Sequence, residues 1–172
     1  IEMNRSFADS IGIAVAGEHY KAGFIKKIIL GKLNRTSWTA EVKVPFLNFD
    51  TVKRGLTANG VGGGRQTHSL SLNGADGKSY VFRSVDKDPV KALPAVLRKN
   101  FVAGLTRQFT ATQHPYGALP VNYLLNATSI LHAQPSLFIL PDDPKLGMFQ
   151  KEFGGMLGML EEKPKSEDAE HP

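Results

Sequence analysis

The stretch that decides the fold of this chain reads Gly60-Val61-Gly62-Gly63-Gly64-Arg65-Gln66-Thr67, and alternating runs at residues 68–72 and 80–85 follow it. In the first run leucines alternate with serines, and in the second a tyrosine and a phenylalanine share one side. This period of two is typical of strands. Between the runs, Asn73-Gly74-Ala75-Asp76-Gly77 supplies turn-forming residues. The stretch therefore predicts a β-hairpin that follows a glycine-rich loop.

The glycine-rich stretch itself points to a binding role. Four of the five residues at 60–64 are glycine, the residue that loses most backbone freedom on folding, so stability alone does not explain them. Uncovered main-chain N–H groups beside arginines would form a cradle for an anion. The alternative is a mobile connection without a ligand. The candidate anion- or nucleotide-binding residues are Gly60, Gly62, Gly63, Gly64, Arg65, Gln66, Arg83, Lys87 and Glu161.

Length and composition bound the class of protein. With 172 residues, 41% hydrophobic and 22% charged, the chain is typical of one soluble globular domain. It contains no cysteine, which excludes disulfides, thiolate metal sites and cysteine nucleophiles. No apolar run approaches the roughly 20 residues of a membrane-spanning helix. We therefore expect no membrane span in this chain.

The net charge of +5 is concentrated early in the sequence. Residues 1–67 contain ten Lys/Arg and five Asp/Glu, whereas residues 161–172 contain five acids and two lysines. The early cations could meet phosphates of lipid or nucleic acid, or they could form a solvated helix face. Nucleic acid is the less favoured partner because no aromatic residues are interleaved with these charges. The cations concerned are Lys21, Lys26, Lys27, Lys32 and Arg35.

The remaining patterns predict an α+β fold with an antiparallel sheet of about five strands and helices packed on one side. We expect an irregular segment at residues 1–19, a single domain at 20–164 and a disordered acidic tail or linker at 165–172. The helix and strand expectations follow from spacing and from Pro/Gly boundaries. Helices are expected at residues 20–33, 90–113 and 119–131, strands at 38–44, 136–140 and 156–160, and turns or short helices at 50–55 and 149–153.

No catalytic or metal-binding set can be assigned from the sequence. The five histidines show no spacing associated with zinc. No Gly-x-Ser-x-Gly nucleophile motif is present. The pair Asp142-Asp143 lies between two prolines, where a charged turn is the simpler interpretation than a cation site.

The order of expected elements is glycine loop, strand, turn, strand with a cation, helix and two further strands. This layout resembles the amino-terminal lobe of protein kinases, in which a glycine loop covers the phosphates and a cation of the third strand pairs with them. By position, the resemblance places Arg83 where that cation stands and Met159-Leu160-Glu161-Glu162 at the hinge that holds the adenine. It implies a nucleotide with magnesium as the cofactor of a parent protein.

The chain departs from the kinase pattern at several positions. The loop lacks the last glycine of Gly-x-Gly-x-x-Gly, and arginine replaces lysine. The helix expected at 90–113 contains no acid to pair with Arg83, and Gln108 is the nearest polar substitute. His-Arg-Asp and Asp-Phe-Gly motifs are missing, and Glu152-Phe153-Gly154 precedes the hinge position. This chain alone is therefore not expected to transfer phosphate.

A second resemblance rests on six blocks of sequence: Gly62-Gly63-Gly64-Arg65-Gln66-Thr67 with Ser69-Leu70, residues 80–89, Ala92-Leu93-Pro94, His114-Pro115, Leu140-Pro141-Asp142-Asp143-Pro144 and residues 158–164. They resemble a conserved domain of large envelope proteins of Bacteroidetes and related bacteria. There the domain is joined to a surface-antigen outer-membrane barrel, often with a metallophosphoesterase domain ahead of it. The resemblance spans residues 20–164. It implies a periplasmic or outer-membrane-associated location and neighbouring domains as partners, and a cytoplasmic location stays open.

Three hypotheses follow. The first is a non-catalytic soluble module, cut from a larger bacterial envelope protein, that binds an anionic small molecule or a neighbouring domain. The second is the nucleotide-binding half of a kinase-like phosphotransferase whose catalytic residues lie downstream, and an accessory domain of a metallophosphoesterase is a further alternative. The third is a binder of anionic lipid or nucleic acid that uses the early cations.

Overall fold

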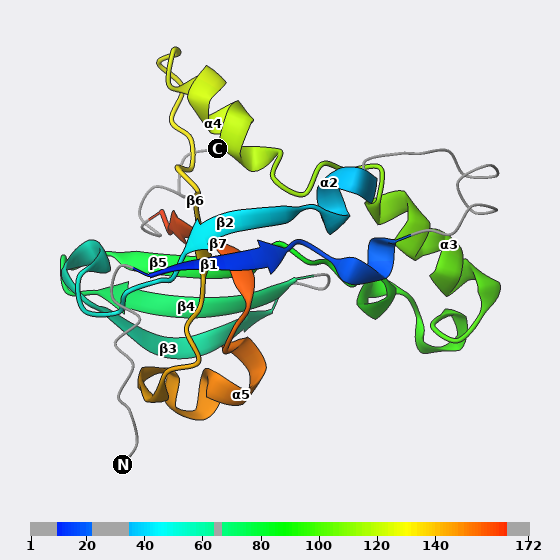
Figure 1. Ribbon diagram of the computed structural model, residues 1–172, viewed down its shortest axis with the longest axis horizontal. Coiled ribbons are helices and arrows are strands. Elements are labelled where there is room, and N and C mark those ends of the chain that lie inside the picture. Colours follow the sequence, from blue (N-terminus) through cyan, green and yellow to red (C-terminus); the bar gives the residue numbers. More distant parts are fainter. Residues whose placement is uncertain (1–9, 22–34, 64–66, 165–172) are drawn as a thin grey trace, which may run out of the picture.

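The computed structural model describes residues 10–21, 35–63 and 67–164 and has an α+β fold (Figure 1). A five-stranded antiparallel sheet is accompanied by a separate two-stranded sheet. The predicted class and the predicted number of strands in the main sheet are therefore confirmed. The helix expected at residues 20–33 and the tail expected at 165–172 lie outside the described residues, apart from Tyr20, which ends a 3-10 turn, and Lys21.

The main sheet is built around the predicted hairpin. Its strands are β3 (Leu56–Gly63), β4 (His68–Gly74), β5 (Ser79–Ser84), β6 (Ser136–Ile139) and β7 (Leu157–Glu162). They lie in the order β3-β4-β5-β7-β6, and all neighbours are antiparallel. Leu70 faces Phe82 and Leu72 faces Tyr80 across the hairpin. The hairpin and the strands expected near 136–140 and 156–160 are confirmed.

The first part of the glycine-rich stretch forms a strand. Gly60 and Gly62 belong to β3 and lie opposite Ser71 and Ser69 of β4, with a register shift between Ala58 and Gly60. The expectation of a loop beginning at Gly60 is wrong, because cross-strand pairing with β4 holds this backbone in the sheet. Residues 64–66 lie outside the described residues.

The two-stranded sheet contains a strand that the sequence pattern did not indicate. β1 (Ile11–Val15) pairs antiparallel with β2 (Glu41–Pro45). The expectation that residues 1–19 are irregular is therefore wrong for 11–15. The even-numbered residues of β1 are Gly12 and Ala14. Because neither is polar, the sequence lacks the alternation of apolar and polar residues that indicates a strand. Pairing with β2 defines this strand.

The strand expected from residue 38 begins three residues later. Trp38 belongs to a short helix, α2 (Arg35–Thr39), and the strand starts at Glu41. The Thr39 hydroxyl donates to the Arg35 carbonyl at 3.0 Å, which favours the helical turn. The Trp38 side chain is fully buried. Tertiary burial of this indole thus overrides the local alternation.

The single long helix expected at 90–113 is wrong. Its place is taken by two 3-10 turns, η3 (Pro89–Ala92) and η4 (Ala95–Leu97), and by α3 (Phe101–Thr110). Pro94 lacks an N–H and forces Leu93 into an extended conformation with ψ of 149°, which interrupts the helix.

The second predicted helix is shorter than expected and stands away from the sheet. α4 (Ala118–Leu125) projects from the body of the molecule (Figure 1). Leu119 packs against the second core cluster, but Tyr123 and Leu124 are 77% and 72% exposed, so the expectation that Tyr123 and Leu124 pack on the sheet is wrong. The sheet face that it would need is covered by β2 and by residues around Ala111.

The main sheet is covered on both faces by separate core clusters. The first contains Leu47, Phe49, Leu56, Leu70, Leu72, Tyr80, Phe82, Leu140, Leu146, Phe153 and Leu160, and the second contains Ala16, Tyr20, Trp38, Val44, Val85, Ala111, Ile139, Leu157 and Met159. The helical segments are divided between the two faces of the main sheet, whereas we expected the helices on one side of it. The remaining short elements are η1 (Glu18–Tyr20), η2 (Val52–Arg54), η5 (Pro144–Phe149) and α5 (Gln150–Phe153), and those expected at 50–55 and 149–153 are confirmed.

Across the described ranges, no helix has both the length and the apolar character needed to cross a lipid bilayer.

Among the described glycines, Gly158 of β7 leaves the least space for a Cβ, and it provides a test of the fold. A Cβ there would overlap the Phe82 ring and would lie 2.6 Å from the Arg83 carbonyl oxygen. We expect Gly158→Ala to lower the free energy of unfolding by about 2–3 kcal/mol, as for overpacked cores. Gly60→Ala is the matched control, because nothing lies within 4 Å of a Cβ there. Urea denaturation measures both, and equal midpoints would contradict this packing.

Candidate functional site

A cavity of about 640 Å³ lies over the face of the main sheet that carries the odd-numbered residues of β5 and β7. We call it the sheet-face cavity. Val81, Arg83, Met159 and Glu161 form its floor, because residues two apart in a strand point to the same face. The connection between α3 and α4, from His114 to Ala118, forms one wall. The neighbouring residues Phe82 and Leu160 point to the opposite face, into the first core cluster.

The structure brings four of the nine predicted site residues together in this cavity. Gly62, Arg83, Lys87 and Glu161 all line it, although they are far apart in the sequence. Gly60 and Gly63 belong to β3 but are not among the lining residues. The other three, Gly64, Arg65 and Gln66, lie outside the described residues. The main-chain cradle therefore stays a prediction, and the described site is lined by side chains.

Cations outnumber acids in the sheet-face cavity. Among the described residues, Arg83, Lys87 and Lys163 line it together with a single carboxylate, that of Glu161. The Arg83 Nη1–Glu161 Oε2 distance is 3.4 Å, and the Arg83 side chain is 54% exposed, so this ion pair is weak. The cavity thus has a net positive charge.

The two lysines of the cavity have neutral partners. Lys163 Nζ donates to Ser71 Oγ at 3.0 Å, and Lys87 Nζ donates to Gln113 Oε1 at 3.1 Å. Neither contact neutralises the ammonium charge, so both lysines can attract an anion. The hydroxyl groups of Thr67, Ser69 and Ser71 also line the cavity and add hydrogen-bond donors.

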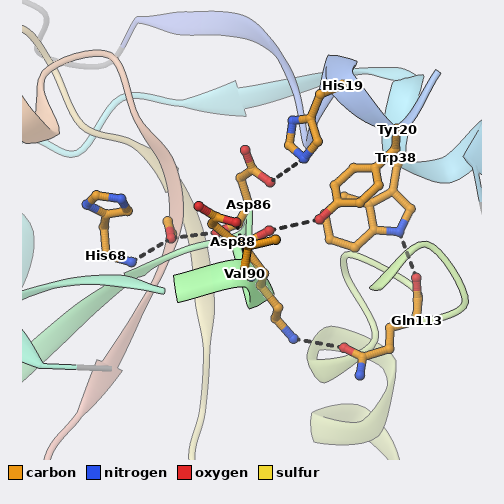
Figure 2. A network of polar contacts seen from close by, with 10 residues as sticks. His19, Tyr20, Trp38, His68, Asp86, Asp88, Val90 and Gln113 are labelled. Carbon is orange, nitrogen blue, oxygen red and sulfur yellow. Dashed lines mark hydrogen bonds and ion pairs between the residues drawn. The ribbon is translucent and has the colours of Figure 1, made fainter. Parts of the chain in front are cut away.

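A network of hydrogen bonds positions Lys87 and the cavity wall (Figure 2). Tyr20 Oη donates to the Lys87 carbonyl at 2.9 Å, and Trp38 Nε1 donates to the Gln113 carbonyl at 2.8 Å. Because Lys87 Nζ also contacts the Gln113 side chain, residues from four separate parts of the chain are joined. Two buried aromatic residues of the second core cluster thus hold the wall in place.

The chain between β5 and the wall is fixed by Ser84. Its hydroxyl accepts from the His68 N–H at 3.0 Å and donates to the Asp86 carbonyl at 2.7 Å. Burial raises the pKa of Asp86, and the nearby His19, 3.4 Å away, opposes that shift. The Asp86 carboxylate is therefore easier to protonate than an exposed one, and it is not among the residues that line the cavity.

Two expectations about cationic residues are corrected here. Arg35, expected on a solvated basic face, is only 4% exposed and donates to the Tyr20 carbonyl at 3.3 Å. Gln108, the expected substitute for an acid beside Arg83, instead accepts a hydrogen bond from Arg35 Nη2. Arg35 was misjudged because a charge pattern alone does not reveal burial. Of the other early cations, Lys21 is exposed and Lys26, Lys27 and Lys32 lie outside the described residues.

Sequence reasoning missed Ser71, His114 and Lys163 as lining residues. No local signal could have identified them, because they reach the cavity only through strand register and through the fold of the α3–α4 connection. Within the described ranges, no group of three or more metal-ligating side chains occurs. His68 Nδ1 contacts Glu152 Oε1 at 2.7 Å, and this pair has no third ligand there.

No family model, no curated protein and no solved structure matches this chain. The functional proposals therefore rest on the residues and on their geometry.

The Tyr20 hydroxyl provides a test of the network. We expect Tyr20→Phe to lower the free energy of unfolding by about 1 kcal/mol, because the Lys87 carbonyl loses a donor while the ring is retained. Tyr123→Phe is the matched control, since Tyr123 is 77% exposed on α4, and it should be neutral. Urea denaturation compares the two. Equal losses would contradict a structural role for the Tyr20 hydroxyl.

Proposed function

We propose that this domain is a non-catalytic module that binds a small phosphate-bearing anion in the sheet-face cavity. The observation that carries the proposal is the presence of three cationic side chains and one carboxylate in a single cavity. A volume of about 640 Å³ is in the range of small-molecule sites. Arg83 offers a planar set of donors that matches phosphate oxygens.

The remaining polar groups of the cavity suit the non-phosphate part of such a ligand. Glu161 is largely buried, with a side chain 18% exposed, and its carboxylate could accept from a hydroxyl or amino group. Val81 and Met159 supply an apolar floor beside it. A phosphate ester with a polar organic body is therefore favoured over inorganic phosphate alone.

The place of this module in a larger protein follows only from the resemblance to bacterial envelope proteins. On that basis the partners are neighbouring domains, and the location is periplasmic or associated with the outer membrane. A role beside a metallophosphoesterase domain would be consistent with a ligand that carries phosphate. These parts of the proposal depend on the six sequence blocks and not on the geometry.

A second candidate function is the nucleotide-binding half of a kinase-like phosphotransferase. It is favoured by two observations: β7 lies between β5 and β6, and Gly62, Arg83 and Glu161 share one cavity. In this interpretation the glycine strand and Arg83 lie near the phosphates and the end of β7 lies near the base. The catalytic groups would be supplied by another part of the parent protein.

Tripolyphosphate binding tests the proposed anion site. We expect Arg83→Gln to weaken binding about 10- to 100-fold, because a charge-assisted hydrogen bond contributes about 1.5–3 kcal/mol. Lys151→Gln, at an exposed residue of α5 outside the cavity, should bind like the unmodified chain. Isothermal titration calorimetry at two salt concentrations measures both variants, and binding should weaken at high salt. Equal affinities of the two variants would overturn the site.

ATP distinguishes the two candidate functions. A site that recognises only phosphate should bind ATP and tripolyphosphate with similar affinity. A nucleotide site should bind ATP with magnesium at least tenfold more tightly, since the base adds contacts near Glu161. The same calorimetric titration with adenosine alone gives the contribution of the base. If adenosine does not bind and ATP gains no affinity, the kinase-like interpretation fails.

A further inference from the structure

A second cavity, of about 1130 Å³, lies at the end of the main sheet where β5 and β6 begin and β7 ends. We call it the strand-end cavity. Among the residues that line the two cavities, only Lys163 is common to both. The Lys163 ammonium donates to Ser71 of the sheet-face cavity, so its charge is directed there. The strand-end cavity is therefore a separate site.

One part of the strand-end cavity is apolar. Tyr80, Phe138 and Leu160 line it on the side of the sheet, where they belong to or pack against the first core cluster. Leu131 also lines the cavity and is 93% exposed. An apolar ligand that enters between Leu131 and the apolar residues of the sheet would remove the Leu131 side chain from water, which is favourable.

The charged part of the strand-end cavity contains Lys53. The nearby Lys78 forms an ion pair with Glu162 at 2.9 Å, so these two charges offset each other. Among the described residues, no carboxylate lies within ion-pair distance of Lys53. Its Nζ lies 5.2 Å from the centre of the Tyr80 ring. The hydrogen bond from Tyr80 and, to a smaller extent, the charge of Lys53 lower the pKa of Asp76, which is not among the residues that line the cavity. The cavity therefore presents one ammonium group without an ion pair above an aromatic floor.

The backbone at Lys53 is strained. Lys53 and Arg54 have φ of 55° and 62°, in the left-handed region that disfavours residues with a Cβ. Glycine would adopt this conformation without the steric penalty. Strain that is retained at a non-glycine residue is frequently associated with a functional side chain. Here the side chain in question is the one that brings the ammonium group to the cavity.

We propose that the strand-end cavity binds an amphiphilic monocarboxylate, such as a medium-chain fatty acid. The apolar chain would lie between Phe138, Leu160 and Leu131, and the carboxylate would pair with Lys53 Nζ. One ammonium group without an ion pair matches one negative charge, whereas a second negative charge on the ligand would add repulsion from the Glu162 carboxylate. The proposal does not depend on the function of the sheet-face cavity.

Decanoate, used below its micellar concentration, tests the proposal on the full chain. We expect saturable binding with amide shifts at Lys53, Ala133 and Phe138 in NMR spectra. Decanol has the same chain length without the charge, and it should bind at least tenfold more weakly. Shifts confined to the exposed aromatic residues Phe101 and Tyr123, or equal affinities for decanoate and decanol, would overturn the proposal.

Two substitutions of Lys53 separate binding from folding. Lys53→Gly relieves the backbone strain, so its urea midpoint should equal or exceed that of the unmodified chain while its decanoate affinity falls about tenfold. Lys53→Gln should lose affinity to the same extent. Lys151→Gln is the matched control and should retain full affinity. Unchanged decanoate binding by both Lys53 variants would overturn the assignment.

The two cavities can also be tested against each other. Arg83→Gln should leave decanoate binding unchanged, and Lys53→Gly should leave tripolyphosphate binding unchanged. Loss of both ligands in either variant would contradict two separate sites. Failure of tripolyphosphate binding alone would overturn the proposed anion site and leave the carboxylate site standing.

Discussion

The antiparallel pairing of β5 with β7 is the constraint on which the rest of the structure depends. It inserts β7, the last strand of the described residues, between two earlier ones, with Phe82 opposite Leu160 and Arg83 opposite Met159. Gly158 permits this approach because the Phe82 ring and the Arg83 carbonyl occupy the space of a Cβ. A shift of one residue in this register would exchange the core side and the cavity side of β7, because β5 is also held by β4.

The same pairing explains how a core and a charged cavity coexist on one sheet. On one face, large apolar side chains fill the first core cluster. On the other face, β2 and the α3–α4 connection cover only part of the sheet, and polar side chains of β4, β5 and β7 remain accessible beside them. The positive charge arises where these uncovered positions carry Arg83 and Lys163 and the nearby Lys87.

Local patterns predicted those parts of the fold in which neighbouring residues contact one another. The hairpin of β4 and β5 follows from alternation and from the turn around Gly74, and it forms as expected. The prediction of one helix at 90–113 was wrong because it gave more weight to the spacing of apolar residues than to Pro94. Two of those apolar residues, Phe101 and Phe109, are 84% and 63% exposed and so do not mark a buried helix face. β1 was missed because its partner, β2, is distant in sequence.

The candidate site was predictable to a similar extent. The glycine pattern and the expected strand order pointed to Gly62, Arg83 and Glu161, which share one cavity. Lys163 and the wall around His114 depend on long-range contacts that no spacing reveals. Arg35 shows the converse limit, because an arginine that looked solvent-exposed is buried and donates to the Tyr20 carbonyl.

The exposed position of α4 has a consequence for the local stability of the chain. None of its eight residues is buried, and Leu119 at its start packs against the second core cluster, so most of the helix relies on its own backbone hydrogen bonds. Isolated helices of that length are marginal in water. Its opening free energy should therefore be far below that of the sheet, and its amide protons should exchange with solvent before those of the sheet. A protease that needs an unfolded segment would then cut the native chain here before any strand.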